Sequence, residues 1–502
     1  MVKRRHRERT CECIREGLPD NVGRDVKARY VVKKQEKWNH AEASFYRDAF
    51  FEERKEKHMI RIYNTKTLQV EEFKPIHEGH VDMYVCGPTV YNFAHIGNAR
   101  PMVVFDVLKR LFEAEGYTVK YVSNFTDVDD KIINKAIEEG TTEKEITERY
   151  IDAYQALRRQ LNTELPDITP KVTETMEGII AFVKQMVDNG TAYVVNGDVY
   201  FSVDSVPGYG SLSHQKLDQL EAGARIETND QKRNPYDFAL WKKTDKGITW
   251  DSPWGPGRPG WHTECVVMIN ENMGPMIDIH GGGMDLRFPH HENEEAQSMA
   301  VNHHTLANYW IHNAMINING EKMSKSLGNV LWAKDVIDKL GVNTTRWLMS
   351  SVHYRKELNF SEETIETANK ELKRVLDPLR QADIKAAMSG VEFAPDYDEE
   401  AWRHFLDQMD DDMNTPNAYA VIFDTVKKLN GTLRQREIDF AAVGKTRNAV
   451  EKMLNLLGIA VEKITVTDED RELYAKWNAA KAEKDFAAAD EYRKLLAEKG
   501  LA

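Results

Sequence analysis

The chain has 502 residues, of which 41% are hydrophobic and 30% charged, and its formal net charge is −13 at pH 7. This length fits about three domains of ~150 residues, each able to bury a core. The chain lacks the run of ~18 apolar residues that a membrane-spanning helix needs, so we expect no membrane partner. Four cysteines argue against a disulfide-stapled secreted protein and favour a reducing cytoplasm.

Residues 1–58 differ in charge from the rest of the chain. They contain 16 Lys and Arg against 11 Asp and Glu, a net charge of +5, which leaves −18 on the other 444 residues. They have no apolar segment typical of a signal peptide, and their acidic residues argue against a transit peptide. We therefore predict a poorly ordered basic extension, or a mis-assigned start upstream of Met59. Cys11 and Cys13 are too weak a pattern to predict a metal site.

Beyond Met59, strand-like and helical stretches alternate. The strand-like VDMYVCG precedes a helix predicted over 99–115, and YTVKYVS precedes a long charged helical region over about 128–162. This order is typical of βαβ units, whose ligands collect at the carboxyl ends of the strands. We predict an α/β fold with a doubly wound, parallel-sheet (Rossmann-like) catalytic domain, and assign its first half to 59–180.

The second half of that domain follows an interruption. Residues 181–256 contain short alternating strands joined by Asn196-Gly197, a hairpin signal, and are predicted to be a small connective insertion. The sheet resumes over 257–315 and includes MIDIHGGG, whose glycines would let a nucleotide approach the backbone closely. A segment over 316–360 carries a Lys- and Ser-rich loop. The pattern over 361–502 is helical and predicts an α-helical bundle.

Two cysteines lie in segments that suit a metal site. Cys86 follows the strand-like MYV, Cys265 lies in GWHTECVVM, and FPHHENEEA comes 25 residues later. Two thiolates, an imidazole and a carboxylate suit Zn²⁺, a borderline-soft ion. Glu294 lies four residues after His290 and three after His291, so either histidine can share its helical face. Isolated cysteines are often simply buried, and His-His-Glu is often a solvated surface, so spacing alone leaves the site open.

Two other segments suit phosphate. His95-Ile96-Gly97-Asn98 precedes a helix whose N-terminal N–H groups attract anions, and His95 and Asn98 would add donors there. Lys322 and Lys325 stand between glycines in INGEKMSKSLGN, which favours a mobile loop that follows a phosphate through a reaction. Each segment alone is also compatible with a purely structural role, the first as a helix cap and the second as an exposed basic turn.

Together, HIGN and a KMSKS loop some 230 residues later are the paired signatures of class I aminoacyl-tRNA synthetases. From about Met59 to near the C-terminus, the chain closely resembles the cysteinyl-tRNA synthetase family. The segments that carry this resemblance are MYVCGPTVYNFAHIGNARP, YVSNFTDVDDKI, GRPGWHTEC, IDIHGGGMDLRFPHHENE, KMSKSLGN and DDMNTPNA.

The resemblance implies a role for individual residues. It implies one Zn²⁺ per chain and selects His290 over His291. The implied sets are Cys86, Cys265, His290 and Glu294 for zinc; Thr126 and Trp261 for the substrate cysteine; His95, Asn98, Asp285 and Lys325 for ATP; and His95, Asn98, Lys322 and Lys325 for catalysis, with Mg²⁺ accompanying ATP.

The implied reaction has two steps. L-cysteine and ATP form cysteinyl-adenylate, and the cysteinyl group then moves to the terminal ribose of tRNA-Cys. A zinc-bound thiolate would distinguish cysteine from serine, so the insertion at 181–256 would need no editing site. By the same resemblance, residues 316–360 hold the KMSKS loop and contact the tRNA stem, while 361–502 form the helical tRNA and anticodon-binding domain. We expect a cytoplasmic monomer.

Alternatives come from the same resemblance. A related cysteine ligase acts on an amino sugar in mycothiol biosynthesis and shares the catalytic half, although the long helical region favours tRNA. A non-catalytic RNA-binding paralogue is disfavoured by intact HIGN and KMSKS segments. Persulfide formation with pyridoxal phosphate needs two lysines where this chain has Lys131-Ile132-Ile133-Asn134. The chain stops at Ala502, before the basic Trp-containing segment usual in the family, which leaves anticodon contact the least defined expectation.

Overall fold

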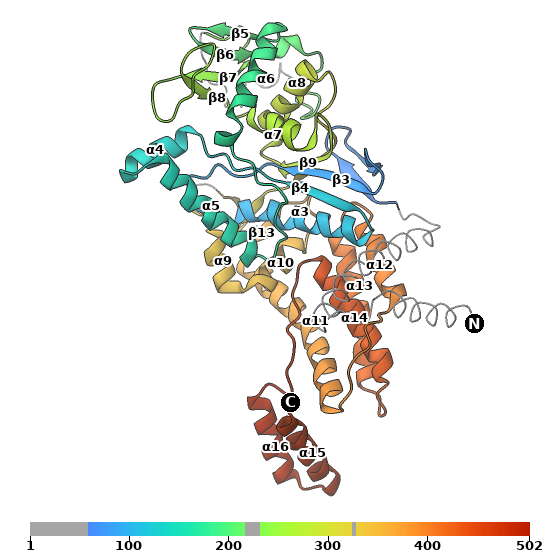
Figure 1. Ribbon diagram of the computed structural model, residues 1–502. Helices are drawn as coiled ribbons and strands as arrows, with labels where there is room; N and C mark the ends of the chain where they lie inside the picture. The colour runs from blue at the N-terminus through green and yellow to red at the C-terminus, as the bar shows by residue number, and fades with distance from the viewer. Residues whose placement is uncertain (1–58, 216–230, 324–327, 502) are drawn as a thin grey trace, which may run out of the picture. The chain divides into compact units, whose positions relative to one another are not determined.

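The computed structural model describes residues 59–215, 231–323 and 328–501 (Figure 1). The expected extension at 1–58, with Cys11 and Cys13, lies outside the described residues, and so does Lys325. None of the described helices is long and apolar enough to cross a membrane.

A four-stranded parallel sheet forms the centre of the catalytic region. Its strand order is β10-β9-β3-β4. The strands are β3 (His80–Val85), β4 (Thr118–Val122), β9 (Ile277–Gly283) and β10 (Ala307–Asn313). Strand β9 is buried along its whole length, as expected for a parallel sheet covered on both faces. The predicted parallel-sheet fold is confirmed, and its carboxyl edge carries Cys86 and Met284, the residues that follow β3 and β9.

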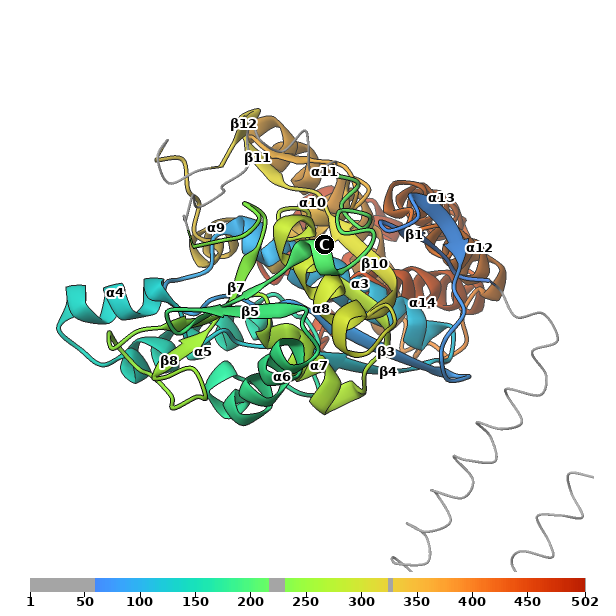
Figure 2. The same cartoon turned by 90° about the horizontal axis from the view of Figure 1, so that it is seen from above.

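Helix α3 (Ile96–Ala114) connects β3 to β4 and begins three residues earlier than the helix predicted over 99–115. His95 caps it, and the His95 N–H donates to Asn98 Oδ1 at 3.1 Å. Most of the helix is buried, because the sheet covers one side and later helices pack against the other (Figure 1; Figure 2 shows the same elements from above). The HIGN segment is therefore the start of a fixed central helix.

The charged region predicted as one long helix over 128–162 is two helices, α4 (Asp130–Glu139) and α5 (Glu143–Gln160). Gly140 ends α4 in a left-handed conformation, with φ of 66°. Thr142 then starts α5 with a capping box that includes Glu145. The break follows from these local signals, since glycine favours a helix end and Thr-x-x-Glu a new start.

The insertion forms a separate antiparallel sheet with the order β5-β6-β7-β8, drawn in green in Figure 1. Its strands are β5 (Ala192–Val195), β6 (Asp198–Phe201), β7 (Phe238–Lys243) and β8 (Gly257–Pro259). Asn196 and Gly197 both have positive φ, which confirms the predicted hairpin turn. The sheet continues to Pro259, three residues beyond the boundary expected at 256.

Around this insertion lie four short elements: α6 (Met176–Asp188), α7 (Glu264–Met273), a π-helical turn η4 (Arg287–His291) and α8 (Glu292–Val301). Helices α6, α7 and α8 share one apolar core with β3 and the insertion sheet. The last residues of this region return to the central sheet as β10.

A second small sheet, with the order β12-β11-β13, carries the first residues of the KMSKS segment. Its strands are β11 (Ile316–Ile318), β12 (Glu321–Lys322) and β13 (Leu358–Phe360). We call β11, β12 and the segment up to Met323 the arm. Helices α9 (Ala333–Leu340) and α10 (Val342–Ser350) lie between the arm and β13 in sequence and pack on α3.

The predicted helical bundle is present over the remaining residues. Its helices are α11 (Glu362–Met388), α12 (Glu399–Met409), α13 (Thr415–Leu433), α14 (Phe440–Leu456), α15 (Asp468–Glu483) and α16 (Phe486–Glu498). Side chains of α11–α14 join the same apolar core as α3 and an N-terminal hairpin of β1 (Arg61–Asn64) and β2 (Gln69–Glu72). Helices α15 and α16 pack instead in a small cluster with Met388.

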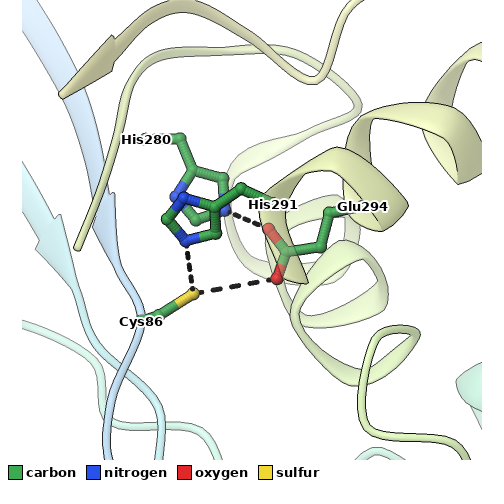
Figure 3. A group of neighbouring side chains, drawn as sticks. All are labelled: Cys86, His280, His291 and Glu294. Carbon is green, nitrogen blue, oxygen red and sulfur yellow. Dashed lines mark hydrogen bonds and ion pairs between the residues drawn. The ribbon is translucent and has the colours of Figure 1, made fainter. Parts of the chain in front are cut away.

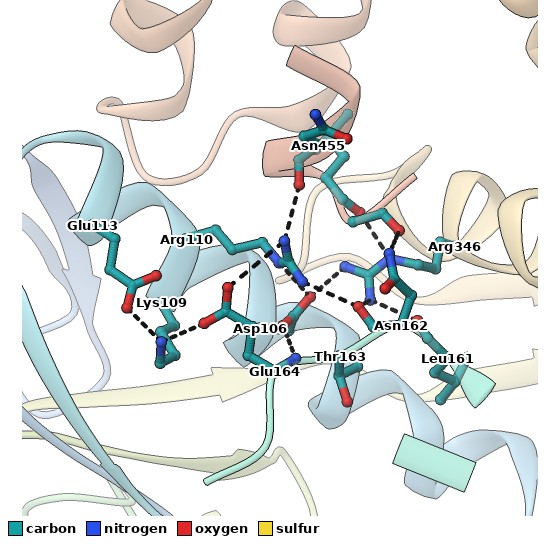
Figure 4. A network of polar contacts seen from close by, with 12 residues as sticks. Asp106, Lys109, Arg110, Glu113, Leu161, Asn162, Thr163, Glu164, Arg346 and Asn455 are labelled. Carbon is teal, nitrogen blue, oxygen red and sulfur yellow. Dashed lines mark hydrogen bonds and ion pairs between the residues drawn. The ribbon is translucent and has the colours of Figure 1, made fainter. Parts of the chain in front are cut away.

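A buried ion pair reinforces the contact between α3 and the bundle (Figure 4). Arg346 of α10 donates to Asp106 of α3 at 2.5 Å and to the Leu457 carbonyl, just after α14, at 2.8 Å. The same guanidinium donates to the Leu161 carbonyl at 2.9 Å. One side chain thus connects three separate parts of the chain, with a carboxylate to balance its charge.

Candidate metal centre and active site

Four predicted ligands meet at the carboxyl edge of the central sheet. One ligand atom from each of Cys86, Cys265, His290 and Glu294 lies within 4.8 Å of the others. The two sulfur atoms are 3.7 Å apart, His290 Nε2 lies 3.8 Å from Cys265 Sγ, and Glu294 Oε1 lies 2.9 Å from His290 Nε2. We call this cluster the thiol side of the site.

Each of these residues is held by a different element. Cys86 follows β3, and its N–H donates to the Gly281 carbonyl of β9 at 3.1 Å. Cys265 lies in the first turn of α7, His290 in η4, and Glu294 in the first turn of α8. Cys265, His290 and Glu294 are almost fully buried. Because four rigid elements fix the four side chains, the cluster is pre-organised.

A second overlapping set is also compatible with a metal ion. It consists of Cys86, His280, His291 and Glu294 (Figure 3). His280 Nε2 lies 2.6 Å from Glu294 Oε2, and His291 Nε2 lies 3.4 Å from Cys86 Sγ. Both sets use Cys86 and Glu294, so they share the same two ligands and differ in the other two.

Sequence reasoning missed three histidines around these ligands: His280 and His312, which are buried, and His262, which is partly buried. His312 Nε2 lies 2.7 Å from His291 Nδ1, and His262 Nδ1 lies 3.0 Å from His290 Nδ1. His280 directly precedes the glycines of IDIHGGG, which was the available signal. Histidines that hydrogen-bond metal ligands fix their orientation and protonation.

The glycines of IDIHGGG have a packing reason. A Cβ on Gly281 would lie 2.2 Å from a ring carbon of Phe105 on α3, and one on Gly282 would lie 3.1 Å from the His291 ring. We expected these glycines to admit a nucleotide. In the fold, the two positions admit an aromatic ring and an imidazole, and so allow α3 and η4 to approach β9.

The ionisable groups of the thiol side shift one another's pKa values. Burial, Cys265 and Glu294 raise the pKa of Cys86 well above its usual value. The hydrogen bond from Cys86 lowers the pKa of Cys265 to about 7 against the effect of burial. Burial alone would lower the pKa of His290, but Glu294 and Cys265 raise it to about 10. Anionic groups crowded in a dry site favour a positive charge among them.

The predicted cysteine pocket adjoins this cluster. The Trp261 ring stacks on the His290 ring with centroids 4.3 Å apart, and Trp261 remains 41% exposed. The Thr126 hydroxyl donates to Glu264 Oε2 at 3.3 Å. Burial raises the pKa of Glu264 well above its usual value, and Cys265 adds to this. An exposed aromatic wall and a buried hydroxyl thus flank the thiol side.

The phosphate-binding candidates form a second region, which we call the phosphate side: His95, Asn98 and Lys322. The first two lie at the start of α3, and Lys322 ends β12 and is exposed. The HIGN segment pairs with the chain after the KMSKS loop, since the Ile96 N–H donates to the Leu331 carbonyl at 2.8 Å and the Ala333 N–H to the Ala94 carbonyl at 2.9 Å.

Asp285 is exposed just beyond β9, where the Met284 N–H donates to the Asn313 carbonyl at 2.9 Å. The structure therefore places Asp285 at the same sheet edge as Cys86. Lys325 lies outside the described residues, so its place relative to His95 and Asn98 stays a prediction.

Comparisons with known proteins agree with this arrangement. Residues 72–370 match the family described as tRNA synthetases class I (C) catalytic domain, and residues 404–462 match the DALR domain. The chain is 46% identical over 452 residues to a cysteine–tRNA ligase of Oceanobacillus iheyensis, covering 88% of this chain and 96% of the relative. It is 46% identical over 452 residues to one of Brevibacillus brevis, covering 88% and 97%.

Solved structures extend the likeness in fold. The chain superposes on Mycobacterium tuberculosis methionyl-tRNA synthetase in complex with methionyl-adenylate, with a TM-score of 0.55 at 17% identity, covering 75% of this chain and 89% of that one. The parallel sheet and the paired HIGN and KMSKS segments agree with relatives that match over nearly their whole length. This chain therefore belongs to the cysteine–tRNA ligase family of class I aminoacyl-tRNA synthetases.

Proposed function

We propose that the chain ligates L-cysteine to tRNA-Cys through a cysteinyl-adenylate, with one Zn²⁺ bound by Cys86, Cys265, His290 and Glu294. The activity follows from family membership, since the relatives are cysteine–tRNA ligases over nearly their whole length. The observation that carries the metal proposal is the buried cluster itself. Two sulfurs, an imidazole nitrogen and a carboxylate oxygen within 4.8 Å suit the size and softness of Zn²⁺.

The choice between the two overlapping ligand sets rests on sulfur. His291 and His290 make equivalent contacts, since His291 Nδ1 lies against His312 and His290 Nδ1 lies against His262. Only the set with His290 includes a second thiolate, Cys265, and soft sulfur ligands favour Zn²⁺. His280 lies against the other oxygen of Glu294, which is the contact of an outer residue that orients a ligand. We therefore assign His280 and His291 to orientation and the other four residues to the ion.

Bound there, zinc would hold the substrate sulfur as a thiolate, a state that a serine hydroxyl resists. The protein contributes the shape around that sulfur. Trp261 stacks on His290 and restricts the approach, while Thr126 and Glu264 line the buried side of the pocket. A dry pocket of fixed size with one soft site discriminates far better than apolar contact, which yields ~1–3 kcal/mol per methylene.

For adenylate formation we propose that His95, Asn98, Lys322 and Lys325 bind the ATP phosphates, with Mg²⁺ accompanying ATP. Asp285 is assigned to the adenosine moiety. Phosphoryl chemistry of this type needs charge placed at the phosphates and no nucleophile from the protein. The N-terminus of α3 supplies further N–H donors beside His95.

The remaining assignments concern the acceptor and the whole molecule. We propose that 59–180 and 257–315 form the catalytic domain around the insertion at 181–256, and that 316–360 contact the tRNA stem. Residues 361–502 would bind the rest of the tRNA, and the matched DALR domain lies within them. We further propose a cytoplasmic monomer. Because the relatives are tRNA ligases and match the helical region too, an amino-sugar acceptor has no observation in its favour.

Two assays on purified protein test this function. Metal analysis should find about one zinc per chain, and ATP–pyrophosphate exchange should depend on cysteine, with serine at least ~10⁴-fold less effective. Charging should occur with tRNA-Cys and fail with the amino-sugar acceptor of mycothiol biosynthesis. Full cysteine-dependent exchange in protein stripped of metal would refute the zinc assignment, and exchange without tRNA charging would refute the acceptor.

A further inference from the structure

Arg100 is a buried cation without an ion-pair partner among the described residues. It lies on α3 two residues after Asn98 and is fully buried. Its Nη1 donates to the carbonyls of Ala314 and Met315, both at 2.7 Å, and its Nη2 donates to the Lys356 carbonyl at 2.6 Å. Burial lowers the pKa of the guanidinium to about 10, so it stays charged at neutral pH.

The three acceptors lie where the arm begins. Ala314 and Met315 connect β10 of the central sheet to β11, and Lys356 stands two residues before β13. Strands β11 and β13 pair in parallel, and the Leu358 N–H also donates to the Met315 carbonyl, at 3.1 Å. Arg100 therefore holds both strands at the point where each enters the small sheet.

That sheet carries Lys322. Strand β12 pairs with β11 through Asn317 and Lys322, so the position of Lys322 is set by the register of β11. The Met323 methyl also lies at the HIGN segment, since a Cβ on Gly97 would be 3.0 Å from it. Two independent contacts therefore join α3 to the arm before the KMSKS loop, in addition to the pairing of residues 94–96 with 331–333 after it.

We propose that Arg100 is a positioning residue for adenylate formation, which fixes the arm and its Lys322 against the HIGN end of α3. The inference rests on the proposed phosphate-binding role of Lys322. Arg100 itself is too deeply buried to contact ATP, and it acts through the backbone of 314–315 and 356.

A comparison with Arg346 supports a geometric role. Arg346 is equally buried, but Asp106 balances its charge, and its other acceptors join α3 to the helical bundle (Figure 4). Arg100 donates its side-chain hydrogen bonds to backbone carbonyls, and Glu357 partly offsets the effect of burial on its pKa without forming an ion pair with it. The planar guanidinium can donate to several carbonyls in fixed directions, and an ammonium group cannot. A charge so costly to bury fits a position where three strand ends must be held in one arrangement.

The test uses Arg100→Lys, Arg100→Gln and, as a matched control, Arg346→Lys, each in the full chain. We expect Arg100→Lys to lower kcat of cysteine-dependent ATP–pyrophosphate exchange by about 30-fold, with KM for cysteine changed less than about threefold. Arg346→Lys should lower the melting temperature about as much as Arg100→Lys does, and it should leave the exchange rate within about threefold of wild type. Arg100→Gln removes the buried charge and keeps an amide donor, so it tests the same point in a variant that avoids an unpaired ammonium.

A double-mutant cycle separates positioning from general damage. If Arg100 acts through Lys322, then Arg100→Lys combined with Lys322→Ala should be within about threefold of Lys322→Ala alone. The inference is wrong if the losses of exchange rate in the two single variants add up in the double variant. It is also wrong if Arg100→Lys exchanges at the wild-type rate while Lys322→Ala is defective. An unaffected Lys322→Ala would refute the proposed role of Lys322 together with this inference. If neither Arg100 variant folds, Arg100 is a structural residue and the inference is wrong.

Discussion

The thiol side and the phosphate side are built in opposite ways. The thiol side is a buried cluster whose four side chains sit on four packed elements, with outer histidines to orient them. The phosphate side combines the fixed start of α3 with an exposed lysine at the end of a two-residue strand. Selection of a small side chain needs a rigid shape, whereas a reacting triphosphate needs charges that can follow it. The two tasks therefore call for different kinds of structure.

The largest expected effect breaks the thiol side. Cys265→Ser replaces one soft ligand in the cluster, so zinc content should fall far below one per chain and cysteine-dependent exchange should drop by ~10³-fold or more. Metal analysis and exchange kinetics measure both. Cys13→Ser, in the expected N-terminal extension, is the control and should retain wild-type zinc. Unchanged zinc in Cys265→Ser would remove the site as assigned.

A loss on the phosphate side should have another signature. Lys325→Ala should cut adenylate formation by hundreds-fold, because loss of a donor aimed at the transition state costs ~2.7–4 kcal/mol. Cysteine affinity and zinc content should stay near wild type. Lys334→Ala, at an exposed lysine of α9 that forms an ion pair with Asp338, is the control. If cysteine binding fell as much as the exchange rate, the two sides would not be separable.

Outer residues of the thiol side should matter less than its ligands. His280→Gln removes the partner of Glu294 Oε2 and keeps a hydrogen-bonding group, so zinc affinity should fall by ~10–100-fold. Competition with a chelator measures it, and His404→Gln on the exposed face of α12 is the control. A complete loss of zinc, equal to that of Cys265→Ser, would indicate that His280 is itself a ligand and favour the overlapping set with His291.

The smallest effect is a pH dependence of stability that belongs to neither side. Burial and Glu115 raise the pKa of Asp410 to about 7, and Arg403 opposes the shift. Because this folded-state pKa exceeds the ordinary 3.8, the folded chain keeps a proton that the unfolded chain releases. The contribution of Asp410 to stability is therefore full below pH 3.8 and is lost as the pH rises to about 7.

Asp410→Asn should flatten the fall of the melting temperature over this window by a few degrees, about what ~1 kcal/mol produces. Its pH profile of exchange should match wild type, since Asp410 is remote from the ligands. Asp407→Asn, an exposed carboxylate of α12 beside the same Arg403, is the control. An unchanged slope in Asp410→Asn would show that Asp410 is ionised throughout.

Much of the fold was accessible from local patterns. The strand before Cys86, the helix after it and the turn at Asn196-Gly197 were predicted because their signals lie within a few residues of each other. The break between α4 and α5 was missed, although Gly140 and the Thr142 cap mark it in the sequence. The prediction of one long helix followed the charged pattern over 128–162 and did not use those two short signals.

The site divides in the same way. Cys86, Cys265 and Glu294 were singled out because their residue types carry metal chemistry, and the family resemblance selected His290 over His291. His262 and His312 were missed, since a lone histidine in an apolar stretch has the same appearance whether it faces a core or a ligand. Arg100 carried no signal at all, because its acceptors are backbone carbonyls 214 to 256 residues away. Every residue has a backbone carbonyl, so the residue types of the acceptors give no sign of such a contact.

The scatter of the thiol ligands along the chain has a consequence during synthesis. Cys86 and Cys265 are 179 residues apart, and Glu294 comes later still. A ribosome adds ~5–20 residues per second, so the first thiol waits ~10 s or more for the last ligand. At the proposed site, zinc would therefore be acquired only after the chain has been synthesised as far as Glu294. A nascent chain truncated before Glu294 would carry Cys86 and Cys265 without the carboxylate that completes the proposed site.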